Sequence, residues 1–71
     1  MRGLFVRALE NKKKIMVVYM DDQHELTQRV VKVLNVKDDR LLVYCYFRKQ
    51  IRTLKIEHVL SAEAVKERVG A

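Results

Sequence analysis

One arginine shares an expected strand face with apolar residues. Residues 51–56 alternate, so that Arg52, Leu54 and Ile56 lie on one face and polar residues lie on the other. A guanidinium on such a face must lie at a rim or be paired, because unpaired burial is costly. Two interpretations stay open. One is an anion site, because guanidinium groups form bidentate hydrogen bonds with phosphate oxygens. The other is an ion pair with Glu57 or another acid that joins two strands.

Aromatic residues are the second group suited to ligand binding. Alternation puts Tyr44 and Tyr46 on one face of an expected strand, and Cys45 and Phe47 on the other. We expect one of these pairs in the core and the other beside the basic residues. An exposed ring can stack on a nucleobase, which contributes ~1–3 kcal/mol per base. Tyr19 and Tyr46 are the stronger candidates for this role, and core packing is the alternative for each.

The remaining polar residues form no recognisable catalytic or metal site. His24, His58 and Cys45 match no metal-ligand spacing, and the chain has one cysteine. Two aspartate pairs, 21–22 and 38–39, fall in expected turns, where Asp bonds to its own backbone. No credible nucleophile with a base is found. We therefore expect no enzymatic activity, no cofactor and no metal.

Length, composition and charge indicate one basic domain. The chain has 71 residues, of which 49% are hydrophobic and 34% charged, and this suits a single packed core. Fifteen Lys and Arg face nine Asp and Glu, giving a net charge of +6 and a pI near 9.8. Such a balance is typical of nucleic-acid binding or of a solvated basic surface. The run Lys12–Lys14 likewise could contact a phosphate backbone or form a solvated helix end. The longest apolar runs, 15–20 and 41–47, are too short to cross a membrane, and no signal peptide is visible. We expect a cytoplasmic protein with no membrane partner.

Hydrophobic periodicity predicts one helix followed by five strands. Val30 and Val31 stand side by side within the second strand, which predicts a bulge or sharp bend there. The pattern predicts a mainly β fold, a small Sm-like antiparallel five-stranded β-barrel that is closed or nearly closed, with an N-terminal α-helix. A single domain over 1–71 is expected, with the barrel at about 14–65. The expected elements are a helix over 2–12, strands over 15–20, 25–36, 41–47, 51–56 and 60–65, a helical turn at 57–59 and a fraying tail at 66–71.

The order of these motifs resembles the WYL domain family, from the helix to about Ala64. The most specific part is Arg48 to Val59: an arginine, a short turn, another arginine, an aromatic or aliphatic residue, and an acidic-basic-aliphatic ending. The other matching residues are Tyr19, Arg29-Val30-Val31 and Tyr44-Cys45-Tyr46-Phe47. The chain departs from the family's pattern at Asp39-Arg40-Leu41 in place of Trp-Tyr-Leu, at Val33 in place of a proline, and at Leu54 in place of an aromatic residue.

The resemblance implies a bacterial sensor module. Members of the family usually follow a winged-helix domain in transcription regulators, or accompany helicases and phage-defence proteins. Their WYL barrel binds nucleic acid, often single-stranded, or another negatively charged ligand through basic and aromatic residues. Carried over to this chain, the ligand-binding residues are Arg29, Arg48, Arg52, Tyr19, Tyr46 and His58.

Two functions are therefore expected, from different classes. The first is a non-enzymatic regulatory module that binds single-stranded nucleic acid or a nucleotide-like anion. The second is an interaction or self-assembly module without a nucleic-acid ligand. Segment 41–47 is apolar on both faces, and open strand edges invite pairing, so a homodimer or a complex with a partner regulator is the alternative.

Overall fold

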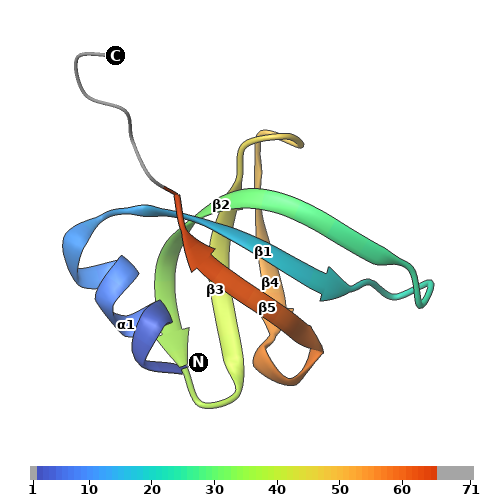
Figure 1. The fold of residues 1–71 in the computed structure, drawn as a ribbon, viewed down its shortest axis with the longest axis horizontal. Helices are drawn as coiled ribbons and strands as arrows, with labels where there is room; N and C mark the ends of the chain where they lie inside the picture. Colours follow the sequence, from blue (N-terminus) through green and yellow to red (C-terminus); the bar gives the residue numbers. More distant parts are fainter. Residues whose placement is uncertain (1, 66–71) are drawn as a thin grey trace.

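The computed structural model describes residues 2–65, which form one helix and a single five-stranded sheet (Figure 1). The strands are antiparallel in the order β4-β3-β2-β1-β5, so β5 returns to lie beside β1. The expected mainly β fold with an N-terminal helix is confirmed. The elements are α1 (Arg2–Asn11), β1 (Lys14–Met20), β2 (Leu26–Lys37), β3 (Arg40–Cys45), β4 (Gln50–Lys55), the 3₁₀ turn η1 (Ile56–His58) and β5 (Val59–Ala64).

Helix α1 buries one stripe of its surface against β2 and β5. Phe5 and Ala8 are buried because they recur on one face at helical spacing. The helix ends in a Schellman motif: the N–H of Lys13 donates to the carbonyl of Ala8 at 3.0 Å, and that of Lys12 to Leu9 at 3.3 Å. Lys12 holds the left-handed conformation, with φ 54°, that this motif requires.

The face of the sheet that packs against α1 carries the core, and we call it the inner face. Ile15 lies opposite Val31, and Val31 lies opposite Cys45. Residues paired directly across an antiparallel ladder share a face, so these three side chains form one buried row. The full set of buried residues is Phe5, Ala8, Ile15, Val17, Tyr19, Val31, Val33, Leu41, Val43, Cys45, Leu54 and Val59.

The predicted bulge in the second strand exists, but it lies further along the strand. The register between β2 and β3 shifts between Val33 and Asn35, and not at Val30 and Val31. Val31 is buried on the inner face and Val30 is half-buried on the opposite face, so their adjacency marks a strand that is apolar on both sides. The shift leaves Leu34 unpaired in this ladder.

The sheet curls but does not close, so the predicted closed barrel is not confirmed. In Figure 1, β2 bends along its length, and the sheet curves with it. Within residues 2–65, β4 pairs only with β3 and β5 only with β1, so both are edge strands. Closure needs a hydrogen-bonded ladder between the first and last strands of the order, and the described strands form none.

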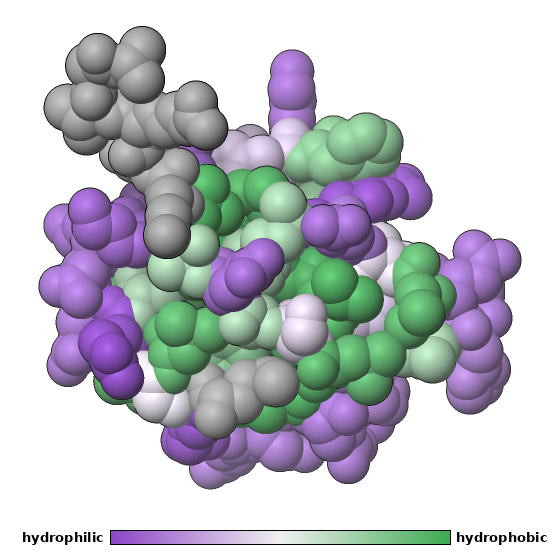
Figure 2. Space-filling model, in the orientation of Figure 1, coloured by the Kyte–Doolittle hydropathy of each residue, from purple (hydrophilic) through white to green (hydrophobic). Residues whose placement is uncertain are grey.

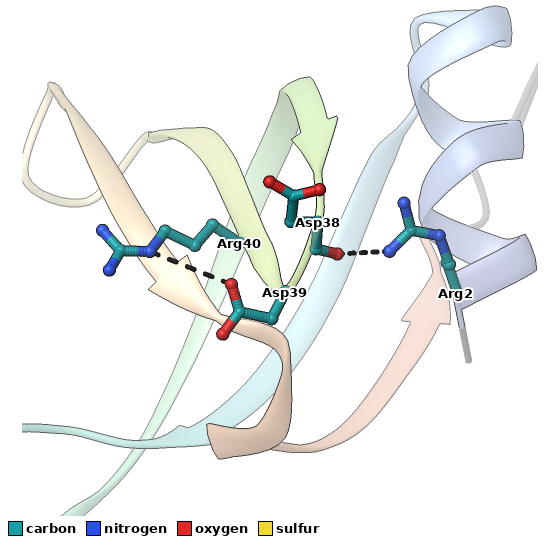
Figure 3. A network of polar contacts seen from close by, with 4 residues as sticks. All are labelled: Arg2, Asp38, Asp39 and Arg40. Atoms are coloured by element: carbon teal, nitrogen blue, oxygen red, sulfur yellow. Dashed lines mark hydrogen bonds and ion pairs between the residues drawn. The ribbon is translucent and has the colours of Figure 1, made fainter.

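Polar contacts join the start of α1 to the turn between β2 and β3 (Figure 3). The guanidinium of Arg2 donates to the backbone carbonyl of Asp38, the residue that turns the chain with φ 52°. The ion pair between Arg40 and Asp39, at 4.0 Å, is exposed and contributes little to stability. The helix start is therefore held at one end of the sheet.

The third strand is shorter at its end than the sequence predicts. The third strand ends at Cys45, because residues 46–49 form the turn into β4. The tail expected at 66–71 lies outside the described residues. No helix among residues 2–65 has the length and apolar character needed to cross a bilayer.

Candidate functional site

Helix α1 covers only part of the inner face, and basic residues occupy the rest. The helix lies at one end of the sheet and the β1–β2 hairpin at the other (Figure 1). Arg29 lies opposite Val17 on β1, in the half of β2 nearer the hairpin, and Arg52 lies opposite Val43 on β3. Both arginines are half-buried. The two partners are core residues, so both arginines belong to the inner face, as the alternation of Arg52 with Leu54 predicts.

These residues line a cleft with a volume of about 460 Å³. That volume lies within the range of small-molecule sites in proteins, about 300–1,000 Å³. The cleft is walled by the β1–β2 hairpin, by β4 and by η1. Its lining residues are Tyr19, Met20, Asp21, Asp22, Gln23, Glu25, Thr27, Arg29, Arg40, Arg48, Arg52, Thr53, Leu54, Lys55 and His58.

Positive charge predominates in the cleft. Five of its lining residues are lysine or arginine and three are aspartate or glutamate. The ion pair of Arg40 with Asp39 is the only one within 4.0 Å among residues 2–65. Arg52 therefore makes no ion pair with Glu57 or another acid in the described part of the chain. The interpretation of Arg52 as an ion-paired residue that joins two strands finds no support there. The charge of Arg52 is available to an anion.

Arg29 is held in place by its neighbours. Its guanidinium donates to the backbone carbonyl of Gln28 at 2.7 Å and lies 4.3 Å from the ring centroid of Phe47. A guanidinium has five N–H donors, so several remain for a ligand oxygen. Arg48 follows Phe47 in the exposed β3–β4 turn. The turn thus brings a further arginine to the cleft.

The acidic part of the cleft belongs to the hairpin turn. The Oδ1 atom of Asp21 accepts the backbone N–H groups of Gln23 and Glu25, each at 2.9 Å. Its Oδ2 atom accepts the hydroxyl of Thr27 at 3.2 Å. The N–H of Glu25, helped by Gln23 and Thr27, lowers the pKa of Asp21 below its ordinary value. His24 completes the turn with φ 61°.

This lowered pKa predicts acid-sensitive stability. A carboxyl whose pKa is lower in the folded state stabilises the fold above its unfolded pKa, and loses that effect as pH falls through the folded value. At pH 6 we expect the native protein to have a higher thermal midpoint of unfolding than Asp21→Asn. The difference between their midpoints should shrink below about pH 4. Asp22→Asn, an exposed neighbour, should follow the native protein throughout. A pH-independent difference between the native protein and Asp21→Asn, followed by circular dichroism, would contradict the assignment.

Five of the six predicted ligand-binding residues line the cleft, but their exposure differs. Arg48 and His58 are exposed. Tyr19 is only 8% exposed and belongs to the core, so little of its ring is available for stacking on a ligand. The five residues are Tyr19, Arg29, Arg48, Arg52 and His58.

Tyr46 lies elsewhere. It packs edge-on against Tyr44, with ring centroids 5.1 Å apart, and the Nζ atom of Lys14 lies 4.7 Å from its ring centroid. Both tyrosines are half-buried, and Phe47 is 71% exposed although its alternation partner Cys45 is buried. The expected split into a core pair and a presented pair is therefore wrong, because the strand ends at Cys45 and the turn redirects Phe47.

Sequence reasoning did not place several polar residues in the cleft, among them Thr27, Arg40 and Lys55. Thr27 lies opposite Tyr19, and Arg40 lies opposite Lys55. The pairing register of the two hairpins, counted outward from their turns, is the signal that places them. Across residues 2–65, no group of three or more His, Cys, Asp or Glu side chains is arranged to hold a metal ion.

Comparison with known proteins supports the fold. No protein-family model and no curated protein matches the sequence. Among solved structures, a chain of proteasome accessory factor B/C (PafBC) of Arthrobacter aurescens matches with a TM-score of 0.83 and 22% sequence identity. The match covers 97% of this chain and 12% of the PafBC chain. The chain therefore shares the fold of the matched part of PafBC, a WYL-domain-containing regulator, and this supports a WYL-like fold. The chain spans only a small part of that structural neighbour.

Proposed function

We propose that this domain is a non-enzymatic regulatory module whose basic cleft binds single-stranded nucleic acid or a nucleotide-like anion. One observation carries the proposal: Arg29, Arg48 and Arg52, which are up to 23 positions apart in sequence, line one cleft. None of the three has an ion-pair partner among residues 2–65. Three guanidinium groups around one hollow form a recognition site for phosphate oxygens.

The shape of the cleft favours a small anion or a single strand over a duplex. Its volume of about 460 Å³ suits one nucleotide-sized group. Single strands also expose their bases to aromatic side chains, whereas a duplex keeps its bases stacked. The WYL-like fold and the resemblance of Arg48 to Val59 to the family's most specific motif support the same ligand class.

The test is a fluorescence anisotropy titration of labelled single-stranded DNA, single-stranded RNA and duplex DNA over a salt series. We expect saturable binding to a single strand that weakens with salt and persists near 0.15 M, which is about physiological ionic strength. Weak binding to all three polymers that vanishes with modest salt would contradict the proposal. The charge of +6 would then be a general surface property.

A second candidate function is self-assembly through the sheet edges. The edge strands β4 and β5 carry Ile51 and Leu60, which are 60% and 54% exposed. Figure 2 shows apolar surface across the middle of the view, where β5 and β1 lie in Figure 1, with polar surface around it. Exposed apolar residues on an unpaired edge favour strand addition by a second copy. Sedimentation equilibrium at high micromolar concentration tests this candidate, and a strict monomer would exclude it.

A further inference from the structure

A second hollow lies beside the cleft, and Arg29 is the residue that lines both. This groove has a volume of about 290 Å³ and is mainly apolar. Its lining residues are Met16, Gln28, Arg29, Val30, Tyr46 and Phe47. Met16, Gln28 and Val30 lie on the face of the sheet opposite to the cleft. The cleft and the groove therefore meet at Arg29, on the edge of β2 that β3 leaves unpaired.

The β3–β4 turn sets the aromatic wall of this groove. The N–H of Tyr46 donates to the carbonyl of Val30 at 3.5 Å, and Lys49 turns the chain with φ 54°. Phe47 rests on the guanidinium of Arg29 at 4.3 Å, yet 71% of the residue is exposed. The ring is thus positioned without being buried, and its contribution to the core is small.

We infer that the groove binds a nucleobase stacked on Phe47, while Arg29 holds the adjoining phosphate in the cleft. This inference rests on the proposed function and specifies its ligand as an unpaired base joined to a phosphate. Stacking on an aromatic side chain suits any base, because every base has a π-face. The remaining donors of Arg29 meet phosphate oxygens on the cleft side. A base within a duplex cannot enter the groove, so the geometry selects a single strand.

The experiment compares two labelled strands of about ten nucleotides, a length within the site size of single-strand binding folds. One carries adenine at every position, and the other has the same phosphates and no bases. Both are titrated by anisotropy with the native protein, with Phe47→Ala, and with Ile51→Ala as the matched control. Ile51 is 60% exposed and lines neither hollow. Phe47→Trp adds a direct signal, because the chain has no tryptophan.

Removal of the Phe47 ring should weaken binding of the strand that carries bases and spare binding of the abasic strand. Phe47→Ala should weaken binding of the adenine strand by about 5- to 150-fold. It should leave the affinity for the abasic strand within about twofold, since phosphate contacts remain. Ile51→Ala should bind both strands like the native protein. Phe47→Trp should retain affinity, and the adenine strand but not the abasic strand should quench its emission.

The failures of the two proposals are distinguishable. If the native protein binds both strands with equal affinity, or if Phe47→Ala and Ile51→Ala behave alike, the base site is wrong while the anion cleft stands. An equal loss for both strands in Phe47→Ala would also overturn the base site and would indicate displacement of Arg29. If the native protein binds neither strand, both proposals fail, and an apolar protein partner becomes the better assignment for Phe47.

Discussion

Arg52→Gln is expected to weaken binding of a labelled single strand by about 10- to 150-fold at fixed salt. The substitution keeps a polar side chain but removes a charge-assisted hydrogen bond, which contributes about 1.5–3 kcal/mol. Arg52 carries the strongest expectation because it is half-buried on the inner face, opposite the core residue Val43, with its charge unpaired among residues 2–65. The anisotropy titration measures the change directly. The slope of log affinity against log salt should also become shallower, by about 0.7 for one lost phosphate contact on a single strand.

The matched control is Arg7→Gln. Arg7 is an exposed arginine on α1 that does not line the cleft. Arg7→Gln and Arg52→Gln each remove one positive charge, so they change the net charge equally. Binding by Arg7→Gln should stay close to that of the native protein. Arg52→Lys, which keeps the charge and loses the planar fork, should fall between the two. Equal losses for Arg52→Gln and Arg7→Gln would show that affinity follows net charge and not the cleft.

Phe5→Ala is expected to lower the free energy of unfolding by about 3–5 kcal/mol. Phe5 is fully buried, and with Ala8 it is one of two buried residues on the only helix of the described chain. Small domains have total stabilities near the low end of about 5–15 kcal/mol, so this loss removes much of the folded population. Urea unfolding followed by circular dichroism measures the change.

Val6→Ala is the control for Phe5→Ala. Val6 neighbours Phe5 on the same helix and is 36% exposed, so its truncation should change the unfolding free energy by only about 0.5 kcal/mol. A loss for Phe5→Ala no larger than that for Val6→Ala would contradict the account of α1 as the cover of the inner face. A clear difference between the two variants would locate the core between helix and sheet.

The order of elements follows from local signals in the sequence. Alternation and apolar runs set the strands to within about two residues, and polar clusters mark the turns, because these features depend on neighbours along the chain. The helix was also predictable, since its apolar stripe has helical spacing. The bulge was misplaced because the adjacency of Val30 and Val31 also fits a strand with two apolar faces. Only the pairing register, a long-range property, distinguishes the two cases.

The candidate site was predictable in part, for the same reason. The parity of Arg52 with Leu54 placed that arginine on the inner face, whereas Arg29 and Arg48 rested on the family resemblance. The exposed position of Phe47 beside Arg29 was missed, because it depends on where β3 ends and on the turn that follows. Closure of the sheet could not be judged from the sequence either. Whether β4 and β5 meet depends on the total curl of all five strands.

The measurement that tests the central claim most directly is an NMR titration of the ¹⁵N-labelled protein with a short single strand at about 0.15 M salt. We predict that the largest shifts of backbone amide signals cluster at Thr27, Arg29, Arg48, Arg52 and His58, around the cleft. The exposed surface of α1, including Arg7, should remain unchanged. Shifts concentrated at Lys12–Lys14, or spread evenly over the surface without saturation, would contradict the assignment of the cleft as the binding site.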